Sequence, residues 1–388
     1  MTAIPAPIAE LAARYDATVF ATQRQGARVR LEGAGADVDA LLEGETLRLV
    51  AADPSRRPDA VLRADAATWR RIASDLRGGM AAFRSGRLRI RRDLHLGVGL
   101  LAATSRSRGP GGLRFRHVET AMGTISAMEA GRGTPVVLLH GLGATKASFL
   151  PTVAALAPDH RAIAIDLPGF GDSDKPIGAS YDAPFFARSV EALLDALELE
   201  RAHLVGNSMG GRVALEAGLR APERTDRIVL LAPSLAWLRN RPWAPLLRLV
   251  DPRLGAIQPA PRKLVESIVR RVVPGGDGWT AAGVDEFLRA YLTRQGRVAF
   301  YAAARNIYLE EPHGEKGFWT RLPELRAPAL FVWGKRDQLV PIRFASHVRE
   351  ALPHSEHLEL DCGHVPQLER PRATHEVMLK FLSGPPEN

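Results

Sequence analysis

The chain has 388 residues, of which 46% are hydrophobic and 24% are charged, and its formal net charge is +9. The length allows two domains with a core each, and the composition is that of an ordinary soluble globular protein. No run approaches the roughly 20 apolar residues that span a bilayer, and the N-terminal segment does not resemble a secretion signal, so we expect a cytoplasmic protein. The single cysteine, Cys362, excludes an internal disulfide.

The positive charge is concentrated in the first part of the chain. Residues 1–116 hold 20 Arg against 12 Asp and Glu, whereas residues 117–388 hold 32 Lys and Arg against 31 acids. In Arg87-Leu-Arg-Ile-Arg91, arginines alternate with apolar residues, which is typical of a half-buried strand with one solvated face. The alternative is a surface for anionic lipids or acyl phosphates. Nucleic acid is not expected as a partner, because no aromatic residues are interleaved with these arginines.

The first elements along the chain predict a small α+β domain over residues 1–103. Short strands are expected at residues 47–51 and 60–63, and a helix is expected at residues 66–76, where apolar residues follow a helical spacing. Residues 104–116 contain a small, polar and glycine-rich stretch and are predicted to be a linker.

Part of this first domain resembles a known lipid-binding family. The stretch Ala64-Asp-Ala-Ala-Thr-Trp-Arg-Arg-Ile, the Gly78-Gly79 turn and the segment from Phe83 to Leu94 are similar to the sterol carrier protein type two family over about residues 30–103. The resemblance implies a hydrophobic tunnel between a helix layer and a sheet. The sequence departs from the pattern at Arg91-Arg92, where a glycine would often follow the strand.

Beyond residue 117 the pattern changes to strands that alternate with helices. Short, nearly continuous apolar runs are typical of strands buried on both faces and predict a mostly parallel sheet with helices on each side, an α/β fold. These runs are residues 135–139, 161–166, 202–206, 227–231, 329–334 and 356–360. Residues 233–328 contain no clear strand and are too long for a plain crossover, so we predict a helical cap over the carboxyl edge of the sheet.

Ser208 lies where a buried strand gives way to a helix. Gly206 and Gly210 flank it at G-x-S-x-G spacing, and a sharp turn needs residues without side chains at both places. A serine hydroxyl becomes a nucleophile only when a base removes its proton and hydrogen-bond donors receive the oxyanion. The alternative is that Ser208 is only a turn residue, so the prediction depends on its partners.

Two later loops supply those partners. Asp337 and His364 each follow a predicted parallel strand, and the carboxyl ends of such strands meet at one edge of the sheet. We predict Ser208 as the nucleophile, His364 as the base and Asp337 as the acid that orients the base, in the chain order expected of this fold. Asp337 could instead cap the following helix, and Asp361 is a competing acid.

The loop His140-Gly-Leu-Gly-Ala144 directly follows another predicted strand, and its glycines let backbone N–H groups point into the site. We assign the oxyanion hole to the N–H groups of Leu142 and Met209. Cys362, although close to the predicted base, is interpreted as a small buried residue. The histidines have no spacing typical of a metal site, and neither a metal nor a cofactor is expected.

Five motifs occur in order at predicted strand ends. They are His140-Gly-Leu-Gly, Asp166-Leu-Pro-Gly-Phe-Gly-Asp-Ser, Gly206-Asn-Ser-Met-Gly-Gly211, Gly334-Lys-Arg-Asp and Gly363-His364. Residues 117–383 therefore resemble the lid-bearing α/β-hydrolase family. The resemblance implies a helical cap over the active site and acyl transfer to water by the serine. Members that open epoxides or remove halides carry Asp at the position of Ser208.

These observations predict a cofactor-free serine hydrolase that cleaves a hydrophobic carboxylic ester. Aromatic residues are concentrated in the predicted cap, which favours a bulky apolar acyl substrate, although some of them must pack the cap onto the core. They are Trp237, Trp243, Trp279, Phe287, Tyr291, Phe300, Tyr301, Tyr308, Phe318 and Trp319. The basic N-terminal module is a candidate for contact with lipid or a membrane surface.

Three alternatives stay open. The Gly-Asn-Ser-Met-Gly-Gly elbow resembles that of carbon–carbon bond hydrolases that act on dienoic ketoacids, but those enzymes commonly carry Trp where Val365 follows the histidine. A scaffold that binds lipid or a partner without turnover would use the same fold. Acyl transfer to an alcohol or thiol would use the same catalytic residues.

Overall fold

The computed structural model describes residues 4–20, 26–74, 82–83, 85–105, 112–236, 249, 251–257, 261–272 and 277–384. Of the predicted linker, residues 106–111 lie outside these ranges. The chain forms two compact units, one made of Met1–Arg116 with Asp277–Arg289 and the other of His117–Gly276 with Ala290–Asn388. The first unit thus includes a segment that the sequence assigned to the cap.

The first unit contains a five-stranded sheet in the order β3-β2-β1-β4-β5, in which β1 and β4 are parallel and the other neighbours antiparallel. Its strands are β1 (Ala27–Glu32), β2 (Val38–Glu43), β3 (Thr46–Ala51), β4 (Ala60–Arg63) and β5 (Arg89–Arg91), and its helices are α1 (Ala6–Ala12), α2 (Ala66–Ser74), α4 (Leu94–Ala103) and most of α10 (Asp277–Tyr291). The two predicted strands and the predicted helix correspond to β3, β4 and α2. In β5, Ile90 is buried between two exposed arginines, so the predicted alternation is observed.

Asp285 of α10 contacts the end of β5 within the first unit. Its carboxylate accepts a hydrogen bond from Arg91 Nε at 2.7 Å and another from the backbone N–H of Arg92 at 2.9 Å. Arg92 has a φ of 75°, in the left-handed region that few residues with a side chain adopt. The Arg91-Arg92 pair, where the sequence departs from the sterol carrier pattern, therefore binds a helix from a distant segment of the chain.

The apolar space between the helices and the sheet of the first unit is very small. Its lining includes Leu11, Leu31, Trp69 and Leu100, and its volume is about 10 Å³. One water molecule needs about that volume. This space is too small to hold an acyl chain.

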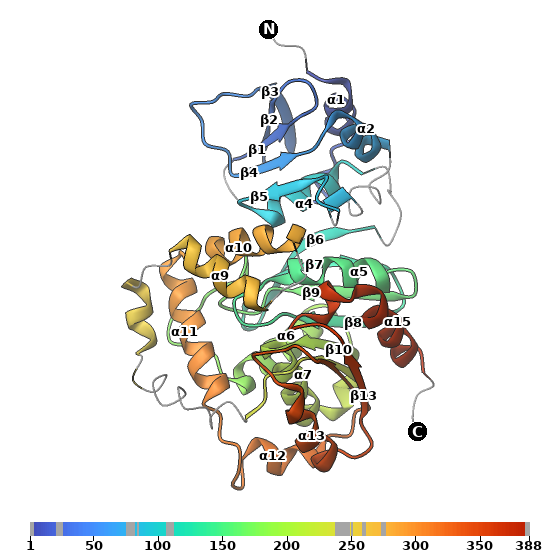
Figure 1. The fold of residues 1–388 in the computed structure, drawn as a ribbon, viewed down its shortest axis with the longest axis vertical. Helices are drawn as coiled ribbons and strands as arrows, with labels where there is room; N and C mark the ends of the chain where they lie inside the picture. Colours follow the sequence, from blue (N-terminus) through green and yellow to red (C-terminus); the bar gives the residue numbers. More distant parts are fainter. Residues whose placement is uncertain are drawn as a thin grey trace. The chain divides into compact units, whose positions relative to one another are not determined.

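The second unit contains an eight-stranded sheet in the order β13-β12-β11-β10-β8-β9-β7-β6 (Figure 1). The strands are β6 (Arg114–Thr120), β7 (Gly123–Ala130), β8 (Thr134–Leu139), β9 (His160–Ile165), β10 (Ala202–Asn207), β11 (Thr225–Leu231), β12 (Ala329–Gly334) and β13 (Glu356–Leu360). The six strands from β8 to β13 are parallel, as predicted, and β7 runs antiparallel to β9. The strands β6 and β7 were not predicted.

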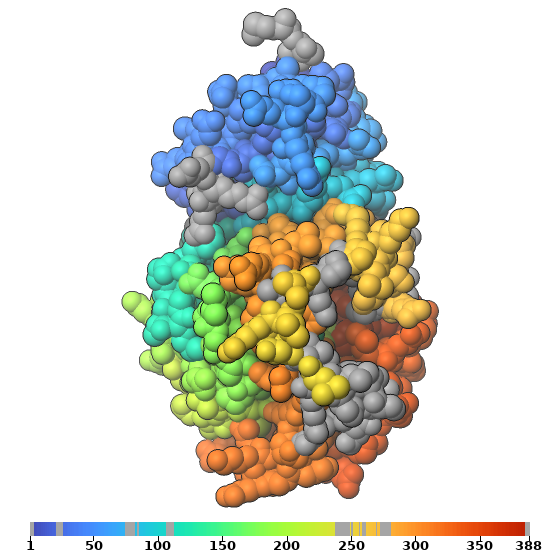
Figure 2. Space-filling view, turned by 90° about the vertical axis from the view of Figure 1, so that its left-hand side faces the viewer, coloured from blue at the N-terminus to red at the C-terminus, as the bar shows by residue number. Residues whose placement is uncertain are grey.

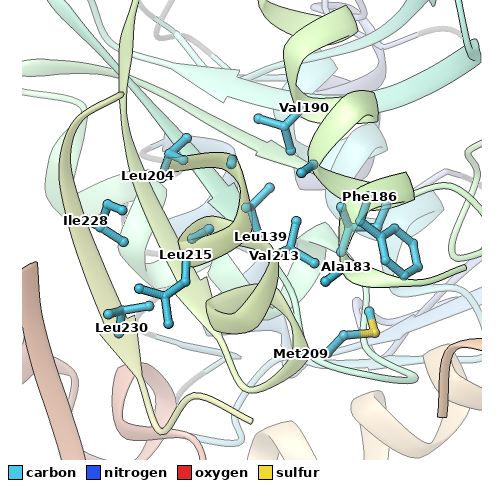
Figure 3. Packing of buried hydrophobic residues seen from close by; sticks show 14 of the residues in the cluster. Leu139, Ala183, Phe186, Val190, Leu204, Met209, Val213, Leu215, Ile228 and Leu230 are labelled. Carbon is cyan, nitrogen blue, oxygen red and sulfur yellow. The ribbon is translucent and has the colours of Figure 1, made fainter. Parts of the chain in front are cut away.

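The second unit also contains helices among its described residues. They are α5 (Leu150–Leu156), α6 (Ala183–Ala196), α7 (Met209–Arg220), α9 (Arg262–Val272), α11 (Arg294–Tyr308), α12 (Phe318–Arg321), α13 (Ala345–Ala351), α14 (Pro366–Glu369) and α15 (Pro371–Leu382), with a 3₁₀ turn η4 at Pro252–Ile257. Helix α6 packs on α7 and α5 packs on α15, while α7 also contacts β10 and β11. Figure 3 shows Val213 and Leu215 of α7 among apolar side chains of α6 and the strands. This packing fixes the helix that begins directly after Ser208.

No helix among the described residues is both long enough and apolar enough to cross a bilayer.

Candidate active site

Ser208 stands at the tight turn between β10 and α7, with φ 53° and ψ −116°. A residue with a side chain in such a sparsely populated conformation stores on the order of 1–3 kcal/mol. The glycines on either side have a steric reason: a Cβ on Gly206 would lie 2.2 Å from the carbonyl oxygen of Gly210, and one on Gly210 would lie 1.9 Å from that of Leu139. The G-x-S-x-G pattern is therefore what permits this turn.

The structure brings Asp337 and His364 together in the loops after β12 and β13. His364 Nδ1 lies 2.7 Å from Asp337 Oδ2, and both side chains are almost fully buried. The other carboxylate oxygen of Asp337 accepts hydrogen bonds from the backbone N–H groups of Leu339 at 2.8 Å and Val340 at 2.9 Å. Asp337 thus closes its own turn with one oxygen and holds the imidazole with the other.

Asn207 joins the turn at Ser208 to the histidine loop. Its side-chain amide donates hydrogen bonds to the carbonyl oxygen of Leu231 at 2.9 Å and to that of His364 at 3.1 Å. These bonds link the ends of β10 and β11 with the loop that follows β13. The asparagine of the Gly-Asn-Ser-Met-Gly-Gly sequence therefore positions the histidine backbone beside the serine.

Asp361, the competing acid, and Cys362 precede His364 in the same loop, and their environments differ from that of Asp337. The Asp361 side chain is 69% exposed and pairs with Arg336 at 3.0 Å, whereas Asp337 is buried against the imidazole. Cys362 is buried, and this burial raises the pKa of its thiol to about 12, so it stays protonated. The geometry therefore favours Asp337 over Asp361 as the partner of His364 and gives Cys362 no nucleophilic character.

The predicted oxyanion loop lies against Ser208. A Cβ on Gly141 would come within 3.2 Å of Ser208 Cβ, so the loop passes directly beside the serine. His140 is buried and accepts a hydrogen bond at Nε2 from the N–H of Leu167 at 3.0 Å, which leaves Nδ1 to donate to the carbonyl oxygen of Gly141 at 2.8 Å. Burial lowers the pKa of His140. This neutral imidazole thus braces the loop that contains Leu142.

Asp166 directly follows the neighbouring strand β9 and is hydrogen bonded to residues at the same end of the sheet. Its carboxylate accepts hydrogen bonds from the backbone N–H of Lys146 at 2.7 Å and of Asp172 at 2.9 Å, and it pairs with the buried ammonium of Lys146 at 2.5 Å. Burial alone would raise the pKa of Asp166, but the Lys146 ammonium holds it below its usual value. Gly171 completes the turn with a φ of 50°, and a Cβ there would meet the Asp166 carboxyl at 2.1 Å.

Comparison with known families identifies the fold. Residues 134–371 match the family described as alpha/beta hydrolase fold, which is more than half of the chain. The chain belongs to the α/β-hydrolase family. It is therefore a hydrolase of the α/β fold, and its predicted Ser, Asp and His follow the order of that fold.

Relatives of this α/β-hydrolase act on different bonds. It is 31% identical over 282 residues to a 2-hydroxy-6-oxononadienedioate/2-hydroxy-6-oxononatrienedioate hydrolase of Escherichia coli K12, across 70% of this chain and 96% of that protein. A membrane phospholipase A, a bacterial virulence factor, is 28% identical with a TM-score of 0.60, across 75% of this chain and 93% of that one. A Bacillus subtilis carboxylesterase at 24% identity and a TM-score of 0.54, across 71% and 93%, shows the fold alone.

Sequence reasoning missed Ser234, which the structure of this α/β-hydrolase places beside Ser208. The two side-chain oxygens are 3.0 Å apart, and the backbone N–H of Ser234 donates to the carbonyl oxygen of Ser208 at 3.0 Å. Among the hydrogen bonds of the described residues, the Ser208 hydroxyl pairs with Ser234 and not with His364 Nε2. In the predicted triad the hydroxyl would have to rotate before the imidazole could take its proton, which is compatible with the loose geometry of many ligand-free sites.

Tyr308, at the C-terminal end of α11, is one of the predicted cap aromatics and lies near these two serines. Its hydroxyl lies close enough to those of Ser208 and Ser234 that both act to lower its pKa. Burial raises the pKa of the phenol to about 12, so it keeps its proton and stays available as a donor. Trp237 and Trp243 lie outside the described residues.

A buried ion network connects α11 to the helix of the elbow. Arg212, one turn after the elbow on α7, donates from Nε to Glu310 at 2.6 Å and from Nη2 to Glu216 at 2.8 Å. Arg321 also pairs with Glu216, at 3.0 Å, and the Arg212 guanidinium lies 4.6 Å from the centre of the Phe318 ring. Because Glu310 is two residues beyond Tyr308, the network holds Tyr308 beside Ser208.

Proposed function

We propose that this α/β-hydrolase is a serine hydrolase that cleaves hydrophobic carboxylic esters through an acyl-enzyme. The observation that carries the proposal is a serine on the strained turn at the sheet edge where His364 bonds to Asp337 at 2.7 Å. A serine oxygen attacks a carbonyl carbon and leaves an acyl ester that water can hydrolyse, whereas the alkyl ester needed for epoxide or halide chemistry requires a carboxylate nucleophile.

The proposed first half-reaction begins when Ser208 Oγ turns from Ser234 toward His364 Nε2. The imidazole takes the hydroxyl proton as the oxygen bonds to the carbonyl carbon, and the Asp337 carboxylate stabilises the imidazolium. The N–H groups of Leu142 and Met209 receive the oxyanion, and such a donor is worth about 3 kcal/mol when removed from other hydrolases. Collapse expels the alcohol, which takes the proton from His364. Water then repeats these steps on the acyl-enzyme.

A second candidate is hydrolysis of a carbon–carbon bond in a dienoic ketoacid. It is supported by the 31% identity to the Escherichia coli dienedioate hydrolase across nearly all of that protein. Two features favour an ester. Val365 stands where such enzymes commonly carry Trp, and the 28% identical structure is a membrane phospholipase A.

Hydrolysis of p-nitrophenyl acyl esters of increasing chain length by the purified full-length protein tests the proposal. We expect turnover that rises from short to medium or long chains, because the predicted cap is rich in aromatic residues. Absence of ester turnover, with release of the acid from a dienoic ketoacid, would favour the second candidate. Absence of both would favour a lipid-binding scaffold, and alkyl ester products formed in the presence of alcohols would indicate acyl transfer.

Tyr308→Phe is expected to lower kcat/KM for the preferred ester about fivefold, because one neutral hydrogen bond contributes about 1 kcal/mol. In the proposed reaction the phenol, freed when Ser208 rotates toward the histidine, donates to the ester oxygen that leaves. Steady-state kinetics beside Tyr301→Phe provides the control, since the Tyr301 hydroxyl bonds to Tyr291 at 2.9 Å. An unchanged or higher rate for Tyr308→Phe would mean that the phenol only restrains the resting serine.

We also propose that the first unit supports the handling of apolar substrates. The resemblance of residues 30–103 to sterol carrier proteins and the exposed Arg87 and Arg89 support contact with lipid or a membrane surface through this basic module. The small space inside the unit argues against storage of an acyl chain in the form seen here. Vesicle binding by an Arg87→Gln/Arg89→Gln variant measures this contribution, and unchanged binding would contradict it.

A further inference from the structure

Exposed apolar side chains are concentrated in one segment of the second unit. Of the eight large apolar side chains that the described residues expose, five lie within residues 249–268. Their exposed fractions are 80% for Leu249, 54% for Leu254, 80% for Ile257, 58% for Leu264 and 54% for Ile268. Single apolar residues on a surface are ordinary, but a group of them in one short segment marks an interaction surface.

Helix α9 has two contrasting sides. Val265 is 8% exposed and faces inward, whereas Leu264 and Ile268, four residues apart, share the outward side with Arg271. The helix contains four basic residues and one acid, and Lys263 and Arg271 are exposed. An apolar stripe flanked by Lys and Arg is the pattern of helices that lie in the plane of a membrane interface.

The 3₁₀ turn η4 also exposes apolar residues. Gly255 of η4 is buried against Tyr301 of α11, where a Cβ would lie 2.2 Å from the tyrosine ring, so this side of the turn is occupied. Leu254 and Ile257 of the same turn are exposed. Figure 2 shows the yellow atoms of η4 and the amber atoms of α9 together on the side that faces the viewer.

We propose that α9 and η4 form a docking face that inserts its apolar side chains into the surface of a bilayer containing anionic lipids. The occupant follows from the chemistry of the face: leucine and isoleucine side chains enter the acyl boundary, and Lys263 and Arg271 pair with lipid phosphates. A protein groove could bury the same apolar stripe, but it would have to desolvate the flanking charges or supply matching acids, whereas an anionic lipid surface offers charge along its whole plane.

The position of η4 gives this face a consequence for the active site. Helix α11, on which η4 packs, ends at Tyr308, whose hydroxyl lies near Ser208. Docking would therefore bring a lipid surface one helix away from the serine, as an enzyme for membrane-dissolved esters requires. This consequence rests on the proposed function, whereas the binding itself does not depend on turnover.

The test is flotation of the full-length protein with vesicles of phosphatidylcholine alone or mixed with phosphatidylglycerol. We expect stronger binding to the anionic vesicles, weakened by salt because surface charges are screened. Leu264→Ser/Ile268→Ser should reduce the partition coefficient for anionic vesicles about tenfold, and Lys263→Gln/Arg271→Gln should reduce it by a similar factor. Ser208→Ala should bind like the unchanged protein, which separates docking from catalysis.

Matched controls distinguish this face from other surfaces. Ile177→Ser removes an isolated apolar side chain that is 85% exposed and should leave binding unchanged. Equal binding of the α9 variants and Ile177→Ser would overturn the proposal, as would loss of binding only in Arg87→Gln/Arg89→Gln. Absence of vesicle binding together with a dimer that Leu264→Ser/Ile268→Ser dissociates in sedimentation would identify a second copy of the chain as the occupant instead. Thermal unfolding checks that each variant is folded.

Discussion

Replacing Ser208 by alanine is expected to lower kcat/KM for the preferred p-nitrophenyl ester by roughly 10⁴-fold or more. The variant loses the hydroxyl that the turn between β10 and α7 presents beside the predicted oxyanion loop, and the Ser234 hydroxyl, 3.0 Å away, lies on a different backbone segment. Burst kinetics and mass spectrometry of the acyl-enzyme measure the loss directly. Substantial remaining turnover with an acyl group on Ser234 would mean that the neighbouring serine is the nucleophile.

A matched variant separates chemistry from backbone strain at the same position. Ser208→Gly removes the same hydroxyl but places a residue without Cβ at φ 53°, so it should be as inactive as the alanine variant. Relief of strain should make it more stable than Ser208→Ala by about 1 kcal/mol, an effect that chemical denaturation can measure. Equal stabilities would mean that the turn imposes no strain on the serine.

The central sheet could be predicted because its strands are buried on both faces. All six residues of β10 and of β12 are buried, and this two-sided burial is what produces a continuous apolar run in the sequence. The strand β6 alternates exposed and half-buried residues and contains Arg114, Arg116 and Glu119, so the same signal is absent. Its partner β7 begins with Gly123 and contains Ala127 and Ala130. Glycine and alanine are depleted in strands, which further weakens a strand prediction.

The candidate site was predictable where it depends on strand ends and unpredictable where it depends on tertiary packing. Asp337 and His364 follow neighbouring parallel strands, so topology alone brings their loops to one edge. Ser234 also follows a strand, β11, and its place after that strand was the only available signal, because a serine after a proline is common in loops. Tyr308 reaches Ser208 from a helix 100 residues further along the chain, held by the ion network around Arg212.

Asp337→Asn is expected to lower kcat by roughly 10⁴-fold while leaving the protein folded. The asparagine oxygen can still accept from the N–H groups of Leu339 and Val340, so the turn persists. Its amide nitrogen, in place of the oxygen that lies 2.7 Å from His364 Nδ1, would donate to the imidazole. The proton of the neutral ring would then sit on Nε2, which could no longer accept the serine proton.

The control for that variant is Asp361→Asn, three residues before the histidine. Its carboxylate is 69% exposed and pairs with Arg336 on the surface, and exposed pairs contribute only about 0–1 kcal/mol. Activity should therefore remain within about twofold of the unchanged enzyme, because the imidazole keeps its buried partner. If the two variants behaved in the reverse way, Asp361 would be the orienting acid, and the histidine loop would have to swing outward during turnover to meet it. The bond from Asn207 to the carbonyl oxygen of His364 opposes such a movement, which is why we expect the loss of activity to follow Asp337.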